Sequence, residues 1–100
     1  MAYHLDEHIK KEIIALAQEY GIKKVVLFGS RARGTNRERS DIDLAVSGGD
    51  ITRFSVNIDE EIRTLLMFDV VDLDAPVQPA LREEISRDGV VLYEEVCQFL

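Results

Sequence analysis

The chain has 100 residues, of which 46% are hydrophobic, and its 19 acidic and 12 basic residues give it a net charge of −7. That length suits one small domain over residues 1–100, no apolar stretch approaches the roughly 18–20 residues of a membrane span, and no basic segment followed by an apolar one marks a signal peptide. Because an acidic chain attracts phosphate backbones poorly, we expect no direct binding of nucleic acid and no membrane association.

The first third of the chain predicts a helix, a buried strand and the start of a second helix. Apolar residues keep a helical period over 5–20, and Gly21 follows as a left-handed stop. The continuous apolar run at 25–28 ends in Gly29 and is typical of a strand buried on both faces. We expect a short helix to begin at Ser30.

The middle of the chain predicts a second strand, a helix and a third strand. Polar and apolar residues alternate through 41–46, which indicates a strand with one apolar face. Asp50 can cap the next helix, whose apolar residues recur at steps of four from Phe54 to Leu66. Residues 67–73 then predict a third strand.

The last part of the chain predicts a helix that begins at Pro79 and runs over about 79–88, with Gly89 after it. Residues 90–93 add either a short strand or an extended tail. The order of elements is therefore roughly αβαβαβα, which implies a small β-sheet with helices packed on it.

Two carboxylates lie two residues apart on the second predicted strand. A strand places residues i and i+2 on one face, so Asp41 and Asp43 point the same way, opposite to Ile42. Unpaired carboxylates this close repel each other, whereas Mg²⁺ prefers oxygen ligands and is held by one or two carboxylates together with substrate phosphates. The pair therefore indicates a divalent-cation site; the alternative is a solvated strand end.

A candidate phosphate site precedes these carboxylates. At Gly29 the backbone can approach a ligand closely, and a helix that starts at Ser30 would offer free N–H groups to an anion. The Ser30 hydroxyl can donate to a phosphate oxygen, and Arg31 or Arg33 could add bidentate contacts. The alternative is an ordinary strand-to-helix turn capped by Ser30. The segment is neither a Walker A loop nor a G-x-G-x-x-G fingerprint.

The third predicted strand carries further carboxylates. Asp69 lies at its start, and Asp72 and Asp74 project to the opposite face. A third carboxylate near Asp41 and Asp43 would allow two metal ions, or would serve as a general base for an attacking hydroxyl. Parity alone leaves Asp69 and Asp72 open.

Two segments together resemble a known signature. The residues Leu27–Gly34 and Ser40–Leu44, with ten residues between Ser30 and Asp41, closely resemble the nucleotidyltransferase signature of the DNA polymerase β superfamily. The segment Ile85–Glu94 is typical of its small prokaryotic members, so the resemblance covers nearly the whole chain. It implies the nucleotidyltransferase fold, which is α+β with a small mixed β-sheet flanked by helices.

The resemblance also implies roles for individual residues. It assigns nucleotide binding to the glycine-serine turn and its neighbours: Gly29, Ser30, Arg31, Arg33 and Ser40. It assigns catalysis and metal binding to three carboxylates: Asp41, Asp43 and Asp69. In the family the third carboxylate is followed by two apolar residues near a strand start, which favours Asp69, with Asp72 as the reserve. The implied cofactor is Mg²⁺, as two ions, and the implied substrate is ATP.

Small members of the family commonly act as the antitoxin beside a HEPN-domain ribonuclease toxin and transfer AMP to one of its tyrosines. We expect the same role here, in a hetero-oligomer whose partner supplies the acceptor, because the chain leaves no room for an acceptor-binding domain. Two alternatives stay open. One is a non-catalytic, nucleotide-binding antitoxin that acts by direct binding, and the other is a small-molecule adenylyltransferase. The single cysteine, Cys97, has no basic partner and fits a reducing cytoplasm.

Overall fold

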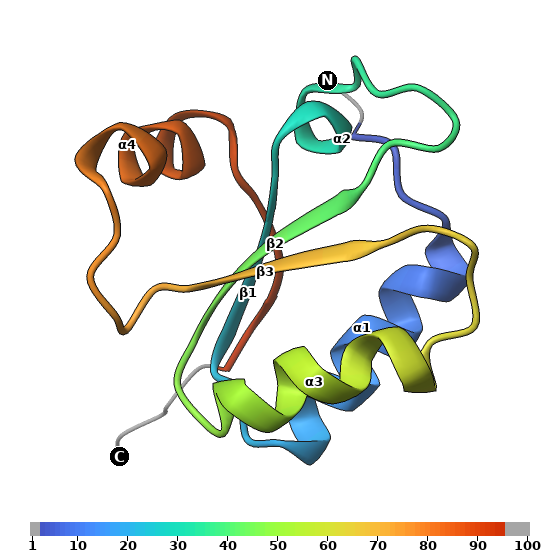
Figure 1. The fold of residues 1–100 in the computed structure, drawn as a ribbon, viewed down its shortest axis with the longest axis vertical. Coiled ribbons are helices and arrows are strands. Elements are labelled where there is room, and N and C mark those ends of the chain that lie inside the picture. The colour runs from blue at the N-terminus through green and yellow to red at the C-terminus, as the bar shows by residue number, and fades with distance from the viewer. Residues whose placement is uncertain (1–2, 96–100) are drawn as a thin grey trace.

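The computed structural model describes residues 3–95, and its centre is a four-stranded sheet in the order β3-β2-β1-β4 (Figure 1). β1 is antiparallel to both β2 and β4, whereas β2 and β3 are parallel, so the predicted mixed sheet is confirmed. The elements in chain order are α1 (Glu7–Glu19), β1 (Lys24–Phe28), α2 (Ser30–Arg33), β2 (Ile42–Ser47), α3 (Ile51–Glu61), β3 (Phe68–Asp72), α4 (Pro79–Asp88) and β4 (Val90–Glu94). The open question about residues 90–93 is settled in favour of a strand.

Capping residues set the bounds of the first helix. Asp6 accepts a hydrogen bond from the backbone of His8 at 2.7 Å, so α1 begins at Glu7 and not at residue 5. Gly21 takes a φ of +69°, as the left-handed stop requires. The prediction for this helix is confirmed to within two residues.

The helical spacing in the middle of the chain predicts too long a helix. α3 begins after Asp50, whose carboxylate accepts from the backbone of Arg53, as expected, but it ends at Glu61. Ile62 is already extended, and the chain then turns to enter β3. Ile62 still reaches the core, because the residue directly after a helix can point to the same side, and Leu66 lies outside the helix.

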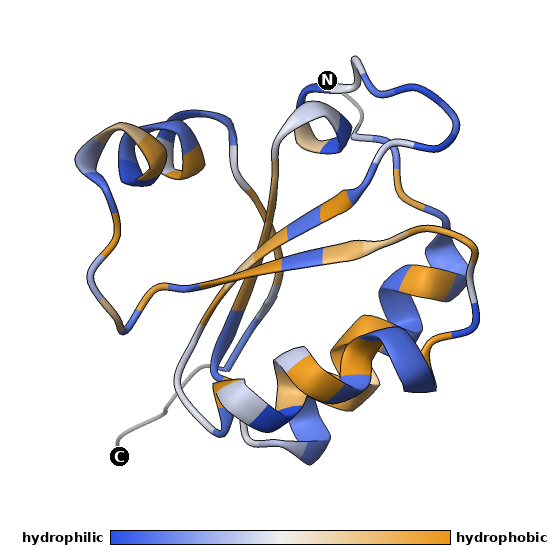
Figure 2. Cartoon of the chain, viewed as in Figure 1, coloured by the Kyte–Doolittle hydropathy of each residue, from blue (hydrophilic) through white to orange (hydrophobic). Residues whose placement is uncertain are grey.

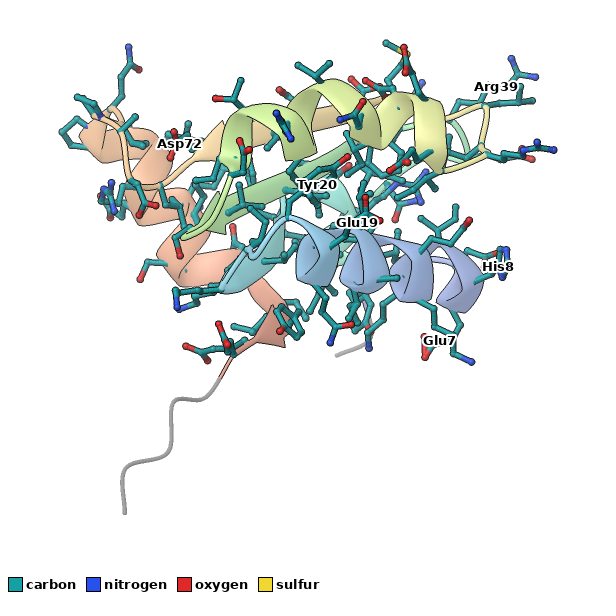
Figure 3. The ribbon with its side chains drawn as sticks, turned by 90° about the horizontal axis from the view of Figure 1, so that it is seen from below. Glu7, His8, Glu19, Tyr20, Arg39 and Asp72 are labelled. Carbon is teal, nitrogen blue, oxygen red and sulfur yellow. The ribbon has the colours of Figure 1, made fainter. Side chains whose placement is uncertain are left out.

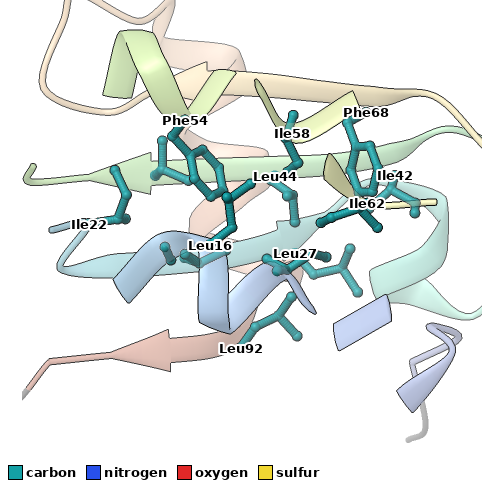
Figure 4. Packing of buried hydrophobic residues seen from close by; sticks show 14 of the residues in the cluster. Leu16, Ile22, Leu27, Ile42, Leu44, Phe54, Ile58, Ile62, Phe68 and Leu92 are labelled. Atoms are coloured by element: carbon teal, nitrogen blue, oxygen red, sulfur yellow. The ribbon is translucent and has the colours of Figure 1, made fainter. Parts of the chain in front are cut away.

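The larger core lies between one face of the sheet and the pair α1 and α3. Apolar residues concentrate in the strands and in the adjoining parts of these two helices (Figure 2), which lie side by side when the molecule is turned (Figure 3). Leu16, Leu44 and Phe54 meet there with residues of every strand (Figure 4). Burial of this apolar face holds the sheet and the two helices together.

The opposite face of the sheet carries a smaller core under α4. Val26, Phe28, Ala45 and Ile85 form it, so α4 covers only part of that face. No helix in the described part of the chain is long and apolar enough to cross a membrane. The cytoplasmic location stays a prediction, and Cys97 lies outside the described residues.

Candidate active site

The acidic residues of β2 and β3 meet where these two parallel strands begin. Asp43 and Asp69 are direct partners in the register. Directly paired residues project from the same face of a sheet, and Asp43 alternates with Ile42 and Leu44, which belong to the core under α1 and α3. Both carboxylates therefore lie on the face that α4 partly covers, and exposed Asp41 comes just before β2.

Asp72 lies on the other face of the same strand. Its partner in the register is Val46, a residue of the larger core, and its Oδ1 accepts a hydrogen bond from the backbone of Asp74 at 2.8 Å. Asp72 and Arg39 lie at opposite ends of the molecule (Figure 3). The structure thus puts Asp69, and not Asp72, beside Asp43, although the roles of these residues stay predictions.

Burial and neighbouring charge make Asp43 hard to ionise. Burial and, after it, the negative charges of Asp69, Asp41 and Glu84 together raise the pKa of Asp43 to about 6, while Arg33 opposes the rise. A cation that approaches Asp43 would stabilise the ionised form of this carboxylate. The chemistry of the site therefore favours a ligand with positive charge.

The turn after β1 brings backbone against that carboxylate. Gly29 has a φ of +76°, which side-chain-bearing residues rarely adopt, and a Cβ there would overlap Oδ2 of Asp43 and lie 3.2 Å from its Cγ. Phe28 is the register partner of Asp43, so the turn sits directly over the carboxylate pair. No side chain caps α2, so no side-chain oxygen would compete with a ligand for the first backbone amides of this helix.

Arg33 joins the site to α4. Its Nη1 lies 3.6 Å from both Glu84 Oε2 and Asp88 Oδ2, which come from one face of the helix. Sequence reasoning did not predict that Glu84 and Asp88 belong to the surroundings of the site. Their four-residue spacing marks a common helix face, but only the position of α4 shows that this face looks towards Asp43.

Arg31 and Ser40 are engaged with the backbone around them. The Arg31 side chain is buried and donates to the carbonyl oxygens of His4, Glu38 and Ser40. The Ser40 hydroxyl accepts a hydrogen bond from the backbone of Arg37 at 2.8 Å. Binding of nucleotide by Arg31 and Ser40 stays a prediction.

The acidic residues suit a magnesium ion that also binds phosphate. No three His, Cys, Asp or Glu side chains within residues 3–95 converge as a metal cage of their own. Mg²⁺ does not need such a cage, because it usually takes one or two carboxylates and completes its shell with water and substrate phosphates. Asp43 and Asp69 supply hard oxygen ligands next to a turn that lacks a Cβ, so the residues present fit the ion.

Known proteins resemble this chain in sequence and in fold. The family model described as polymerase beta nucleotidyltransferase matches residues 11–96. A relative from Methanocaldococcus jannaschii that carries the name protein adenylyltransferase is 31% identical over 88 residues, which cover 82% of this chain and 91% of the relative. A mutant of the toxin-antitoxin MntA-HpeT has a TM-score of 0.68 at 26% identity and covers 91% of this chain and 74% of that one. A toxin-antitoxin solved with AMP-PNP has a TM-score of 0.62 at 25% identity, with 85% and 73% covered.

Proposed function

The chain belongs to the polymerase β nucleotidyltransferase family, and on that premise we propose that it is an antitoxin that transfers AMP from ATP to a tyrosine of a partner HEPN ribonuclease toxin. The modification silences the toxin. The observation that carries the proposal is the alignment of Asp43 with Asp69 beneath the Gly29 turn. The close approach of the Gly29 backbone to the Asp43 carboxylate supports one shared site for a cation and for phosphate.

The similar proteins support this choice of substrate and partner. The relative from Methanocaldococcus jannaschii is named for adenylyl transfer to protein. The toxin-antitoxin structures show the same fold, and one of them was solved with AMP-PNP, an analogue of ATP. Together they favour ATP as the donor and a toxin as the acceptor.

The proposed reaction is an in-line displacement at the α-phosphorus of ATP. The tyrosine oxygen forms a bond to that phosphorus, the bond to the bridging oxygen of the β-phosphate breaks, and pyrophosphate leaves. Asp69 takes the proton of the tyrosine hydroxyl. Its place beside Asp43 on the edge strand β3 supports this role. Backbone amides around Ser30 hold phosphate oxygens, and Arg33 adds positive charge on the same side.

Mg²⁺, held by Asp41 and Asp43 with Asp69 as the third carboxylate, would neutralise the charge of the phosphates when bound. In the protein alone, burial first and then the negative charges of Asp69 and Asp41 raise the pKa of Asp43. Asp43 therefore gains more from a cation than an isolated surface carboxylate would. The proposal includes a hetero-oligomer, since the toxin must bring its tyrosine to this face.

A matched pair of variants on β3 tests the proposal. The purified chain, its HEPN partner, Mg²⁺ and ATP are incubated, and the partner is weighed by mass spectrometry for added AMP. Asp69→Asn should abolish the added mass, whereas Asp72→Asn, which removes the same charge from the other face of the same strand, should leave it.

Two results would count against this function. Equal transfer by Asp69→Asn and wild type would remove Asp69 from the reaction. An unmodified partner that is still neutralised by Asp41→Asn/Asp43→Asn would favour the alternative, in which the chain binds its partner without chemistry.

A further inference from the structure

Arg31 is the only buried charged side chain in residues 3–95, with 6% of its surface exposed. A buried guanidinium is costly unless its donors are satisfied. No carboxylate within the described range forms an ion pair with Arg31. Its charge is compensated by backbone carbonyl dipoles instead, and this placement calls for an explanation.

The Arg31 guanidinium ties three segments of chain together. Its Nε and Nη2 both donate to the carbonyl oxygen of Ser40, at 3.1 and 2.9 Å, and Nη2 also donates to that of Glu38 at 3.2 Å. Nη1 donates to the carbonyl oxygen of His4 at 3.3 Å, and the backbone of His4 donates back to the Arg31 carbonyl at 2.9 Å. The guanidinium thus holds the irregular segment 34–41 against α2.

These contacts end directly beside Asp41. The carbonyl of Ser40 is held by Arg31, and the amide of Ile42 donates to the Met67 carbonyl at 2.9 Å. The backbone is therefore fixed on both sides of Asp41, which is itself exposed. Without the first anchor, only the strand side of Asp41 would be held.

We propose that Arg31 is a positioning residue for Asp41: its guanidinium clamps the carbonyls of Glu38 and Ser40 so that the Asp41 carboxylate stays beside Asp43 when metal and nucleotide bind. This inference rests on the proposed function, because it assigns Asp41 to the metal. It differs from the expectation that Arg31 contacts phosphate, since the forked side chain acts here on backbone oxygens. Lysine cannot reproduce two converging bonds to one carbonyl.

Two measurements on Arg31→Met test the clamp. The first is amide hydrogen exchange without ligand, in which the amides of Arg37 and Ser40 should lose protection while those of Ile42 and α1 keep theirs. The second is calorimetric binding of AMP-PNP, with Mn²⁺ and separately in EDTA. We expect about a tenfold or greater loss of affinity with Mn²⁺ and no change in EDTA.

Companion variants make the result specific. Arg39→Met removes an exposed arginine of the same segment and should match wild type. Arg31→Lys keeps the charge but not the fork, so it should show the same selective loss and serves if Arg31→Met does not fold. In an Asp41→Asn background, Arg31→Met should cause no further loss, because its effect passes through Asp41.

Contrary results are clear-cut. An equal loss of AMP-PNP affinity with Mn²⁺ and in EDTA would mean that Arg31 binds phosphate directly. Unchanged hydrogen exchange at Ser40 would mean that Arg31 does not hold residues 34–41. Either result overturns the proposal. If wild type gains no affinity from Mn²⁺, the proposed function fails, while the exchange data still decide whether Arg31 clamps the segment.

Discussion

Replacing Asp43 by Asn should make the metal-free protein more stable while it removes a proposed metal ligand. Burial and the charges of Asp69 and Asp41 raise the pKa of Asp43 from 3.8 to about 6. At neutral pH the folded chain therefore holds a carboxylate that would ionise more easily in the unfolded chain. Asn has the same shape without the charge, so it removes this penalty.

The size of the gain follows from the change in pKa. A difference of about 2.2, at 1.36 kcal/mol for each pKa unit, sets an upper limit of about 3 kcal/mol. Asp43 is only half-buried, and screening by solvent reduces the value, so we expect about 1–2 kcal/mol at pH 7.5. For a chain of this size that raises the Tm by at least about 4 °C.

The gain should depend on pH with a definite sign. Between about pH 3.8 and 6 the folded wild type binds more protons at Asp43 than the unfolded chain does, so its stability falls as the pH rises through this window. The Asn variant lacks that term. Its advantage should be complete above pH 6 and mostly lost by about pH 4.

Urea unfolding in EDTA at pH 7.5 and at pH 4 measures both values. Glu60→Gln, on the exposed surface of α3, removes one negative charge from the helix on the opposite face of the sheet and serves as the control for net charge. Ionised Asp43 does not destabilise the fold if Asp43→Asn raises the free energy of unfolding no more than Glu60→Gln does at pH 7.5. The same conclusion follows if the increase for Asp43→Asn is as large at pH 4.

Three further changes test other parts of the site. Gly29→Ala forces a side chain onto a backbone with positive φ and against Oδ2 of Asp43. We expect the free energy of unfolding in urea to fall by about 2 kcal/mol and AMP transfer to become undetectable. Transfer at the wild-type level would contradict the close approach of Gly29 to Asp43. Arg33→Gln removes the cation that lowers the pKa of Asp43, so the midpoint in an NMR titration in EDTA should move above about 6; an unmoved midpoint would exclude Arg33 from the site. Ile85→Ala opens a gap between α4 and the sheet and should cost about 2–3 kcal/mol by urea unfolding, whereas a change below about 0.5 kcal/mol would mean that α4 is barely packed.

The fold could be predicted from local patterns because each pattern has one dominant physical cause. The buried run before Gly29 and the alternation around Asp43 specify strands, and the spacing of apolar residues specifies α1. The extent of α3 could not be predicted, because Ile62 points into the core whether or not it is helical. Helical spacing alone cannot detect where such a helix ends.

The candidate site, like the fold, could be predicted from the sequence only in part. Two carboxylates on one strand face can be inferred from parity, but the choice between Asp69 and Asp72 depends on which residue of β3 pairs with Asp43, and parity says nothing about register. The burial of Arg31 was also beyond the sequence. Arg31 and Arg33 look alike in the sequence, whether they contact solvent, phosphate or backbone carbonyls.

The parallel pairing of β2 and β3 has a consequence for engineering this chain. The distance between the two carboxylates is set mainly by the backbone hydrogen bonds that pair β2 with β3. A slip of one residue would turn Asp69 to the opposite face and erase the pair. The exposed side of α3, which joins the two strands, can therefore carry a label, provided that Asp59 is kept, because its carboxylate accepts a hydrogen bond from the backbone of Phe68 at the start of β3.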